Sequence, residues 1–164
     1  MNLSKKSLHR PSILYQAAAL PWRKGRGIEV MLITSLGTRR WVLPKGTLEP
    51  NETARAAAKR EAVEEAGIEG ALDTRPLGAY HYEKQIGSGV QFCSVDVFAL
   101  KVTGQLAQWR EQDQRKLQWF ALADAAAAVN EDDLKQIILA FDPAHKTHAR
   151  ATAPRATARV KRRA

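Results

Sequence analysis

The segment between residues 51 and 67 constrains the fold of this chain more than any other. Its alanines recur every four residues and form one apolar face of a helix: Ala54, Ala58 and Ala62. Asn51 is the predicted N-cap, Glu52 suits the positive end of the helix dipole, and Gly67 is the predicted C-terminal stop. Because alanine side chains are small, we expect this helix to pack closely against a sheet.

Three glutamates, Glu61, Glu64 and Glu65, follow one another on this helix at spacings of three and four residues. Side chains at these spacings are neighbours, with Cβ atoms about 5–6 Å apart. Carboxylates so close together repel one another, and hard divalent ions such as Mg²⁺ bind such oxygen ligands. The pattern indicates a metal site with Arg60 beside it. The alternative is a solvated acidic face, which is common on helices.

The rest of the chain predicts strands on both sides of this helix. Apolar runs at 13–20 and 28–34 predict a hairpin, with Pro21 ending the first strand before a six-residue connection. Further elements are expected at 41–43, 77–85, 90–102 and 117–120 (strands) and at 121–129 and 132–141 (helices). This order predicts an α/β fold, a sandwich with a mixed β-sheet.

Charge divides the chain into three parts. The formal net charge is +9, yet residues 13–142 carry 16 basic and 17 acidic residues. The excess of cations lies in a lead-in at 1–12 and in a tail at 143–164, which has seven Lys/Arg and no acid. We expect one domain at 13–142 and a disordered tail, which either aids solubility or contacts nucleic acid or polyphosphate nonspecifically.

Composition excludes several classes of protein. The single cysteine, Cys93, rules out an internal disulfide and a cysteine-based zinc site, and its apolar surroundings predict a core position. No apolar stretch approaches the length of about 18 residues that spans a bilayer, and the N-terminus lacks the apolar block of a secretory signal. We therefore expect a cytoplasmic protein that does not contact membranes.

The glutamates belong to a longer pattern. Gly46 is followed by five residues and Glu52, then by seven residues and Arg60-Glu61-Ala62-Val63-Glu64-Glu65-Ala66-Gly67-Ile68. This segment resembles the Nudix box, G-x5-E-x7-R-E-U-x-E-E-x-G-U, in which U is a bulky aliphatic residue. All seven fixed positions match, and only Ala62, at the first U, is smaller than the pattern. The chain is identified as a member of the Nudix hydrolase family, which includes MutT-like enzymes.

The resemblance implies a loop–helix–loop motif on an α/β/α sandwich with a mixed β-sheet. It implies that Glu61, Glu64, Glu65 and the carbonyl of Gly46 bind Mg²⁺ or Mn²⁺. In the same way, Arg60 is expected to brace the glutamates, and Glu52 to support the loop. Water then attacks phosphorus in a nucleoside diphosphate linked to a further group, so the expected activity is that of a diphosphohydrolase.

Two glutamates are candidates for the general base. Family members use either a box glutamate or a residue of a later loop, and Glu61 is the first choice. Glu111, in the loop before Trp119-Phe120, is the second. The alternative for Glu111 is an ordinary exposed acid.

The residues before the box indicate a substrate with several phosphates. Arg39, Arg40 and Lys45 are cations close to the predicted metal site, and arginine binds phosphate in bidentate geometry. The lead-in from Trp41 to Gly46 resembles the subgroup that hydrolyses diphosphoinositol polyphosphates and diadenosine oligophosphates, although that subgroup often has glycine in place of Thr47. The alternative is that both arginines are turn residues.

Other functions stay open at this point. The substrate is a small phosphorylated metabolite in the first hypothesis, and an oxidised or normal nucleoside triphosphate or a 5′-triphosphate RNA end in the second. A non-catalytic module that senses a nucleotide is the third, which the complete set of box glutamates disfavours. The chain is expected to be a monomer or a homodimer.

Two further groups of residues have a functional and an ordinary interpretation. Tyr80 and Tyr82 flank His81 on a predicted strand. One interpretation is that an aromatic ring stacks on a base, and the other is that the rings pack in the core. The first turn contains residues that either reach the substrate or are solvated: Trp22, Arg23, Lys24 and Arg26.

Overall fold

Two long strands, β1 (Ile13–Lys24) and β7 (Gly89–Gln105), run parallel through the centre of the sheet. The computed structural model describes residues 12–145. All other strand pairs in this part of the chain are antiparallel, which makes the sheet mixed. The main path has the order β3-β2-β1-β7-β5, with β4 on β1, β6 on β7 and β8 on β2.

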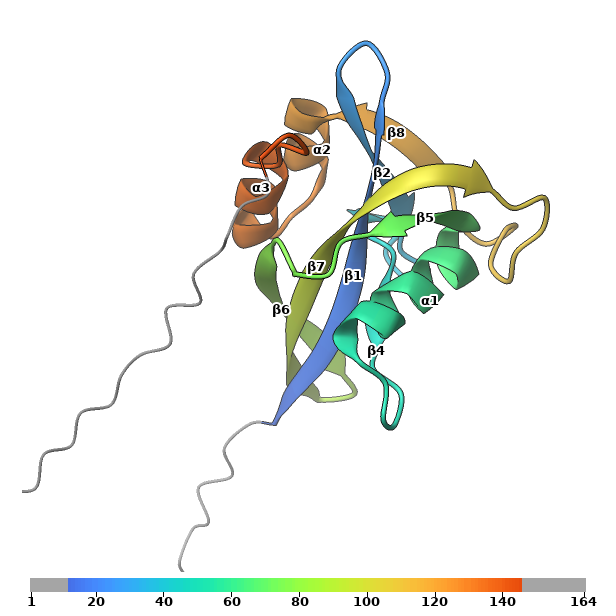
Figure 1. Cartoon of the computed structure of the whole chain (residues 1–164). Coiled ribbons are helices and arrows are strands. Elements are labelled where there is room, and N and C mark those ends of the chain that lie inside the picture. Colours follow the sequence, from blue (N-terminus) through green and yellow to red (C-terminus); the bar gives the residue numbers. More distant parts are fainter. Residues whose placement is uncertain (1–11, 146–164) are drawn as a thin grey trace, which may run out of the picture.

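The remaining elements follow in chain order. The strands are β2 (Ile28–Thr34), β3 (Trp41–Val42), β4 (Lys45–Thr47), β5 (Ile68–Leu72), β6 (Gly78–Ile86) and β8 (Leu117–Ala121). The helices are α1 (Ala54–Ala66), α2 (Leu122–Ala128) and α3 (Asp132–Leu139). Figure 1 shows α1 on one side of β1 and β7 and the pair α2 and α3 on the other.

The sheet carries a separate apolar layer on each face. Side chains of β1 alternate between them: Ala17 and Ala19 pack with α1, whereas Ala18 and Leu20 pack with α2 and α3. Small residues of α1, such as Ala58 and Ala62, are buried against the sheet as their spacing predicted. Helices on both faces of a mixed sheet confirm the α/β/α sandwich.

The predicted end of the first strand at Pro21 is wrong. β1 continues to Lys24, so the connection to β2 has three residues, 25–27, instead of six. Alternate backbone nitrogens point to the same side of a strand, and the nitrogen of Ala19 donates to Pro44 O at 3.1 Å. The nitrogen of Pro21, which carries no hydrogen, therefore faces the same side of β1 as that of Ala19. On this side Pro21 falls between two pairings, since β4 pairs with residues 16–18 and β2 begins to pair at Trp22. The strand can therefore continue through the proline.

The predicted cap of α1 is also wrong. Thr53 is the N-cap, and its side chain accepts a hydrogen bond from Ala56 N at 3.2 Å. Asn51 instead takes a left-handed turn with φ 63°, and Glu52 lies before the helix rather than in its first turn. Gly67 ends the helix at φ 61°, as predicted, and packs against the Trp109 ring.

Two short strands were missed by the sequence analysis, β4 (Lys45–Thr47) and β5 (Ile68–Leu72). Both contain a glycine and are too short for an alternating pattern, and each is held by a long neighbour, β1 or β7. The other predicted strands and helices are confirmed to within a few residues. Cys93 is buried, as expected.

Parts of the predicted organisation fall on residues outside this description. The basic lead-in at 1–12 and the tail at 143–164 lie almost entirely beyond residues 12–145. Within the described part, no helix has both the length and the apolar character needed to cross a membrane.

Candidate active site

The centre of the site is a close approach between β4 and α1. Gly46 of β4 lies directly against the carboxylate of Glu61, and a Cβ atom at residue 46 would overlap both oxygens. Glu61 reaches this position because it lies on the buried side of α1, with its side chain 12% exposed. Glycine at residue 46 is therefore what allows a glutamate oxygen to contact the strand backbone.

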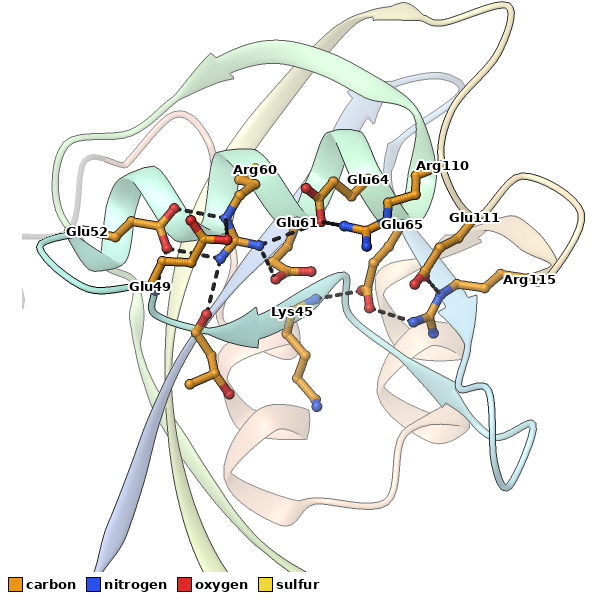
Figure 2. A network of polar contacts seen from close by, with 11 residues as sticks. Lys45, Glu49, Glu52, Arg60, Glu61, Glu64, Glu65, Arg110, Glu111 and Arg115 are labelled. Carbon is orange, nitrogen blue, oxygen red and sulfur yellow. Dashed lines mark hydrogen bonds and ion pairs between the residues drawn. The ribbon is translucent and has the colours of Figure 1, made fainter.

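Arg60 connects this carboxylate to the loop before the helix (Figure 2). Its Nε and Nη2 donate to the two oxygens of Glu52 at 2.9 Å each, a bidentate pair. Its Nη1 donates to Glu61 at 2.5 Å, and Nη2 also donates to Thr47 O at 3.1 Å. Glu52 accepts a further bond from Glu49 N at 2.8 Å, so one arginine holds the loop, β4 and the helix together.

Glu64 and Glu65 contact arginines from the segment before β8 (Figure 2). Arg115 is buried, with only 8% of its side chain exposed, and donates to Glu65 at 2.5 Å, Glu111 at 2.6 Å and Thr34 O at 2.9 Å. Arg110 is exposed and lies 3.3 Å from Glu64. The backbone of Glu111 donates to Glu64 O at 3.1 Å, which fixes this segment against α1.

Burial raises the pKa values of the two buried glutamates, Glu61 and Glu65. The pKa of Glu65 rises to about 7, chiefly because burial disfavours the carboxylate, although Lys45 N and Arg115 oppose the shift. The pKa of Glu61 is raised for the same reason, against the pull of Arg60. The pKa of Glu52 falls to about 2 because it accepts the hydrogen bonds of Arg60 and Glu49 N. Two carboxylates of the cluster are therefore under-compensated, which favours a cation.

The side chains of the predicted metal ligands do not point to a common position in this structure. Among residues 12–145, no three His, Cys, Asp or Glu side chains form a group that could hold an ion. Glu61, Glu64 and Glu65 are directed instead to Arg60, Arg110 and Arg115 respectively. The donor set is nonetheless suited to a hard divalent ion, because it contains two buried carboxylates, those of Glu61 and Glu65, beside the bare strand backbone of Gly46.

The predicted substrate-binding cations lie apart from the glutamates. Arg39 donates to Gln114 O at 2.6 Å and has φ 58°, the geometry of a turn residue. Arg40 donates to Glu131 at 2.6 Å. Lys45 is linked to the cluster only through its backbone nitrogen, which donates to Glu65 at 2.9 Å. Its side chain points away from the glutamates in Figure 2.

Several other candidates from the sequence contact neighbouring side chains of the protein. Trp22 packs edge-on against Phe141, with ring centroids 5.8 Å apart. Arg23 donates to Glu29 at 2.7 Å and lies 4.2 Å above the Trp119 ring. Tyr80 is buried in the core, whereas Tyr82 is partly buried and contacts Lys45.

Sequence analysis missed the arginines that contact Glu64 and Glu65, Arg110 and the buried Arg115. The more consequential of the two is Arg115. It lies outside the box pattern, 50 residues beyond Glu65 along the chain, so no local spacing relates the two. The one available signal was its position four residues after Glu111, a spacing typical of an ion pair within a helical turn.

Comparison with known proteins identifies the family of this chain. The family model described as the NUDIX domain matches residues 16–141, more than half of the chain. The chain belongs to the NUDIX family. This confirms the family expected from the box, and the α1 helix with its flanking loops is the segment that carries the NUDIX motif.

Curated relatives agree with this assignment. Nudix hydrolase 13, mitochondrial, of Arabidopsis thaliana is 38% identical over 104 residues, 60% of this chain and 52% of that protein. Diphosphoinositol polyphosphate phosphohydrolase 3-alpha of Mus musculus is 37% identical over 113 residues, 67% of this chain and 65% of that protein. The match therefore spans about half to two thirds of the length of these relatives.

Solved structures share the NUDIX fold. The C. elegans Ap4A hydrolase binary complex has a TM-score of 0.59 and 22% identity, and covers 77% of this chain and 93% of its own. The MutT protein from Methanosarcina mazei Go1 has a TM-score of 0.61 and 22% identity, with coverage of 86% and 100%. At this identity the likeness establishes the fold.

Proposed function

We propose that this NUDIX domain hydrolyses a diphosphate linkage in a nucleoside- or inositol-linked polyphosphate and that it does so with a divalent ion. The observation that carries the proposal is the pair of buried carboxylates, Glu61 and Glu65, beside the bare backbone of Gly46. Two buried acids with raised pKa values at one strand edge are costly for a purely structural ion pair, and such clusters are typical of functional sites.

Glu61, Glu64, Glu65 and the carbonyl of Gly46 are the residues that would hold Mg²⁺ or Mn²⁺. Such an ion supplies charge neutralisation at the phosphates and activates water for attack. In this proposal Arg60 fixes Glu61 and Glu52, and Arg115 fixes Glu65. These contacts hold the acidic side chains in place before substrate arrives.

Glu61 is the proposed general base. Burial raises the pKa of its carboxyl group, which makes the carboxylate a stronger proton acceptor. Glu111 is the second candidate, because Arg115 holds its carboxylate beside that of Glu65. Substitution of either residue by glutamine distinguishes them: because a general base must be deprotonated to act, loss of the acidic limb of the pH–rate profile is expected only for the true base.

The proposed substrates are diphosphoinositol polyphosphates and diadenosine oligophosphates. The name of the mouse relative supports the first, and the lead-in from Trp41 to Gly46 supports both. Arg39 and Arg40 add little to this argument, since both donate to protein oxygens. Lys45 remains the cation available for a phosphate.

The test is turnover across a panel of substrates with Mg²⁺ or Mn²⁺. The panel contains a diphosphoinositol polyphosphate, diadenosine oligophosphates, oxidised and normal nucleoside triphosphates, ADP-ribose and 5′-triphosphate RNA. We expect metal-dependent turnover that collapses in Glu65→Gln, and the best substrate then defines the subgroup. Absence of turnover with both metals would reject hydrolysis of these substrates and favour the binding-module hypothesis.

The basic tail is tested with the same panel. If it recruits RNA, a chain that ends at residue 145 loses turnover of 5′-triphosphate RNA and retains turnover of small substrates. Equal turnover of RNA by the full and shortened chains would assign the tail to another role. Because such binding depends on counterion release, the effect should shrink as salt rises.

A further inference from the structure

Lys45 presents its ammonium group on the sheet face that α1 does not cover. In the pairing of β4 with β1, Lys45 lies opposite Ala18, and Gly46 lies opposite Ala17. Ala18 belongs to the apolar layer beneath α2 and α3, whereas Ala17 belongs to the layer beneath α1. Since paired residues of neighbouring strands share a face, the Lys45 side chain lies on the opposite side from Glu61.

Tyr82 of β6 holds this ammonium group in place. Lys45 Nζ donates to the Tyr82 hydroxyl at 2.9 Å and lies 4.6 Å from the ring centroid. The hydroxyl in turn donates to Gln16 Oε1 at 2.6 Å, and Gln16 is buried in β1. Because Gln16 takes the hydroxyl proton, the lone pairs of the Tyr82 oxygen are left to face Lys45.

Among residues 12–145 the ammonium group makes direct contact only with neutral groups, and burial lowers its pKa although the Glu65 carboxylate opposes the shift. None of the ion pairs found there within 4.0 Å includes Lys45, and its one side-chain hydrogen bond is to Tyr82. A partly buried cation with no anionic partner is disfavoured unless a ligand supplies the negative charge. An ammonium has three donors, so two remain for such a ligand.

The strand that carries Lys45, β4, lies at an edge of the described sheet. β4 pairs only with β1 in the described sheet, so its other edge is not covered by a strand. The carboxylate of Glu65 lies at that edge, where it accepts from Lys45 N at 2.9 Å. A phosphate chain along this edge would meet the glutamate cluster on one side and Lys45 on the other.

We propose that Tyr82, supported by Gln16, is a positioning residue that aims the Lys45 ammonium at a substrate phosphate other than the one attacked. The proposal rests on the proposed function for the identity of the substrate. Tyr82 acts through Lys45, which contacts the phosphate itself. The chemistry recognised is that of an inorganic diphosphate or the equivalent unit of a larger polyphosphate.

The first experiment compares kinetic constants of full-length variants on the best substrate of the panel. Lys45→Met should raise KM by about tenfold to a hundredfold with kcat within about twofold, the loss of one charge-assisted hydrogen bond used in binding. Tyr82→Phe keeps the ring and removes only the hydroxyl, and should raise KM by about threefold to tenfold. Tyr15→Phe, an exposed tyrosine on β1, is the matched control and should change neither constant.

An unchanged KM in Tyr82→Phe would overturn the proposal. So would a Tyr82→Phe variant that loses kcat and thermal stability together, because that outcome assigns Tyr82 a structural role alone. Calorimetric titration of the metal-free proteins with inorganic diphosphate gives a readout that is independent of turnover. We expect tighter binding by the unmodified chain than by Lys45→Met or Tyr82→Phe.

The two proposals fail differently in these measurements. If no substrate is turned over but diphosphate binding weakens in both variants, the proposed function fails and the Lys45 subsite stands. If turnover is found but the unmodified chain binds diphosphate no better than Lys45→Met, the subsite is overturned. The basic ends of the chain add the same background to every variant, so only the difference between variants counts.

Discussion

The carboxylate of Glu61 and the backbone of Gly46 occupy adjoining space, with no room for a side chain at residue 46. We therefore predict that Gly46→Ala displaces Glu61 and lowers kcat by about a hundredfold, the size expected when a reacting group moves by about 1 Å. Gly37→Ala is the control, because a Cβ atom there meets nothing within 4 Å. Steady-state kinetics on the best substrate provide the measurement, and equal kcat in both variants would contradict the prediction.

Glu65 makes stability depend on pH in a defined direction. Its pKa rises from 4.5 to about 7 in the folded state, so the folded protein holds this proton more tightly than the unfolded chain. Stability from this group is present below about pH 4.5 and is lost as pH rises through about 7. Urea unfolding in chelator at several pH values should show this loss, and Glu65→Gln should reduce the slope.

Addition of Mg²⁺ tests whether the ionised form of Glu65 binds a metal ion. An ion that binds ionised Glu65 stabilises the folded state, and more so above pH 7. We expect this gain in the unmodified chain and little of it in Glu65→Gln. If Mg²⁺ raises the free energy of unfolding of both proteins by the same amount at every pH, Glu65 is not a ligand.

Arg60 should be worth more to stability than an exposed arginine with a similar ion pair. Arg60→Ala removes a bidentate pair with Glu52 and a bond to Glu61, and we expect a loss of about 1–3 kcal/mol in the free energy of unfolding. Arg23→Ala removes an exposed ion pair with Glu29 and a contact with the Trp119 ring, and should cost only about 1 kcal/mol. Denaturant unfolding measures both, and similar losses would show that the Arg60 network contributes no more than a surface pair.

Arg115 should prove as important as the residues of the NUDIX motif. Arg115→Met leaves the buried Glu65 without its cation, and the expected loss in stability of the metal-free protein is about 3–5 kcal/mol. Arg110→Met is the control, because Arg110 is 74% exposed and its removal should cost less than about 1 kcal/mol. Thermal and urea unfolding of the two variants decide the matter, and a mild effect of Arg115→Met would refute the assigned role.

Local patterns in the sequence predicted the helix that carries the glutamates, although they missed the short strand β4 beside it. The alanine spacing predicted the buried face of α1, Gly67 its end, and the three glutamates their common position on the helix. These features depend on residues within one or two helical turns of each other, so short-range geometry determines them. The NUDIX motif and the order of strands were then enough for the family and the sandwich fold.

Tertiary structure decided what those side chains contact. The sequence contained Lys45 and Tyr82, but only the pairing of β4 with β1 places Lys45 on the face opposite α1 and beside Tyr82. Likewise, Arg115 reaches Glu65 because the segment before β8 folds back over α1. Helix periodicity is determined by residues close together in the chain, so the sequence alone was enough to predict it. Contacts between residues far apart in the chain depend on strand order and on the path of the loops, so only the tertiary structure revealed them.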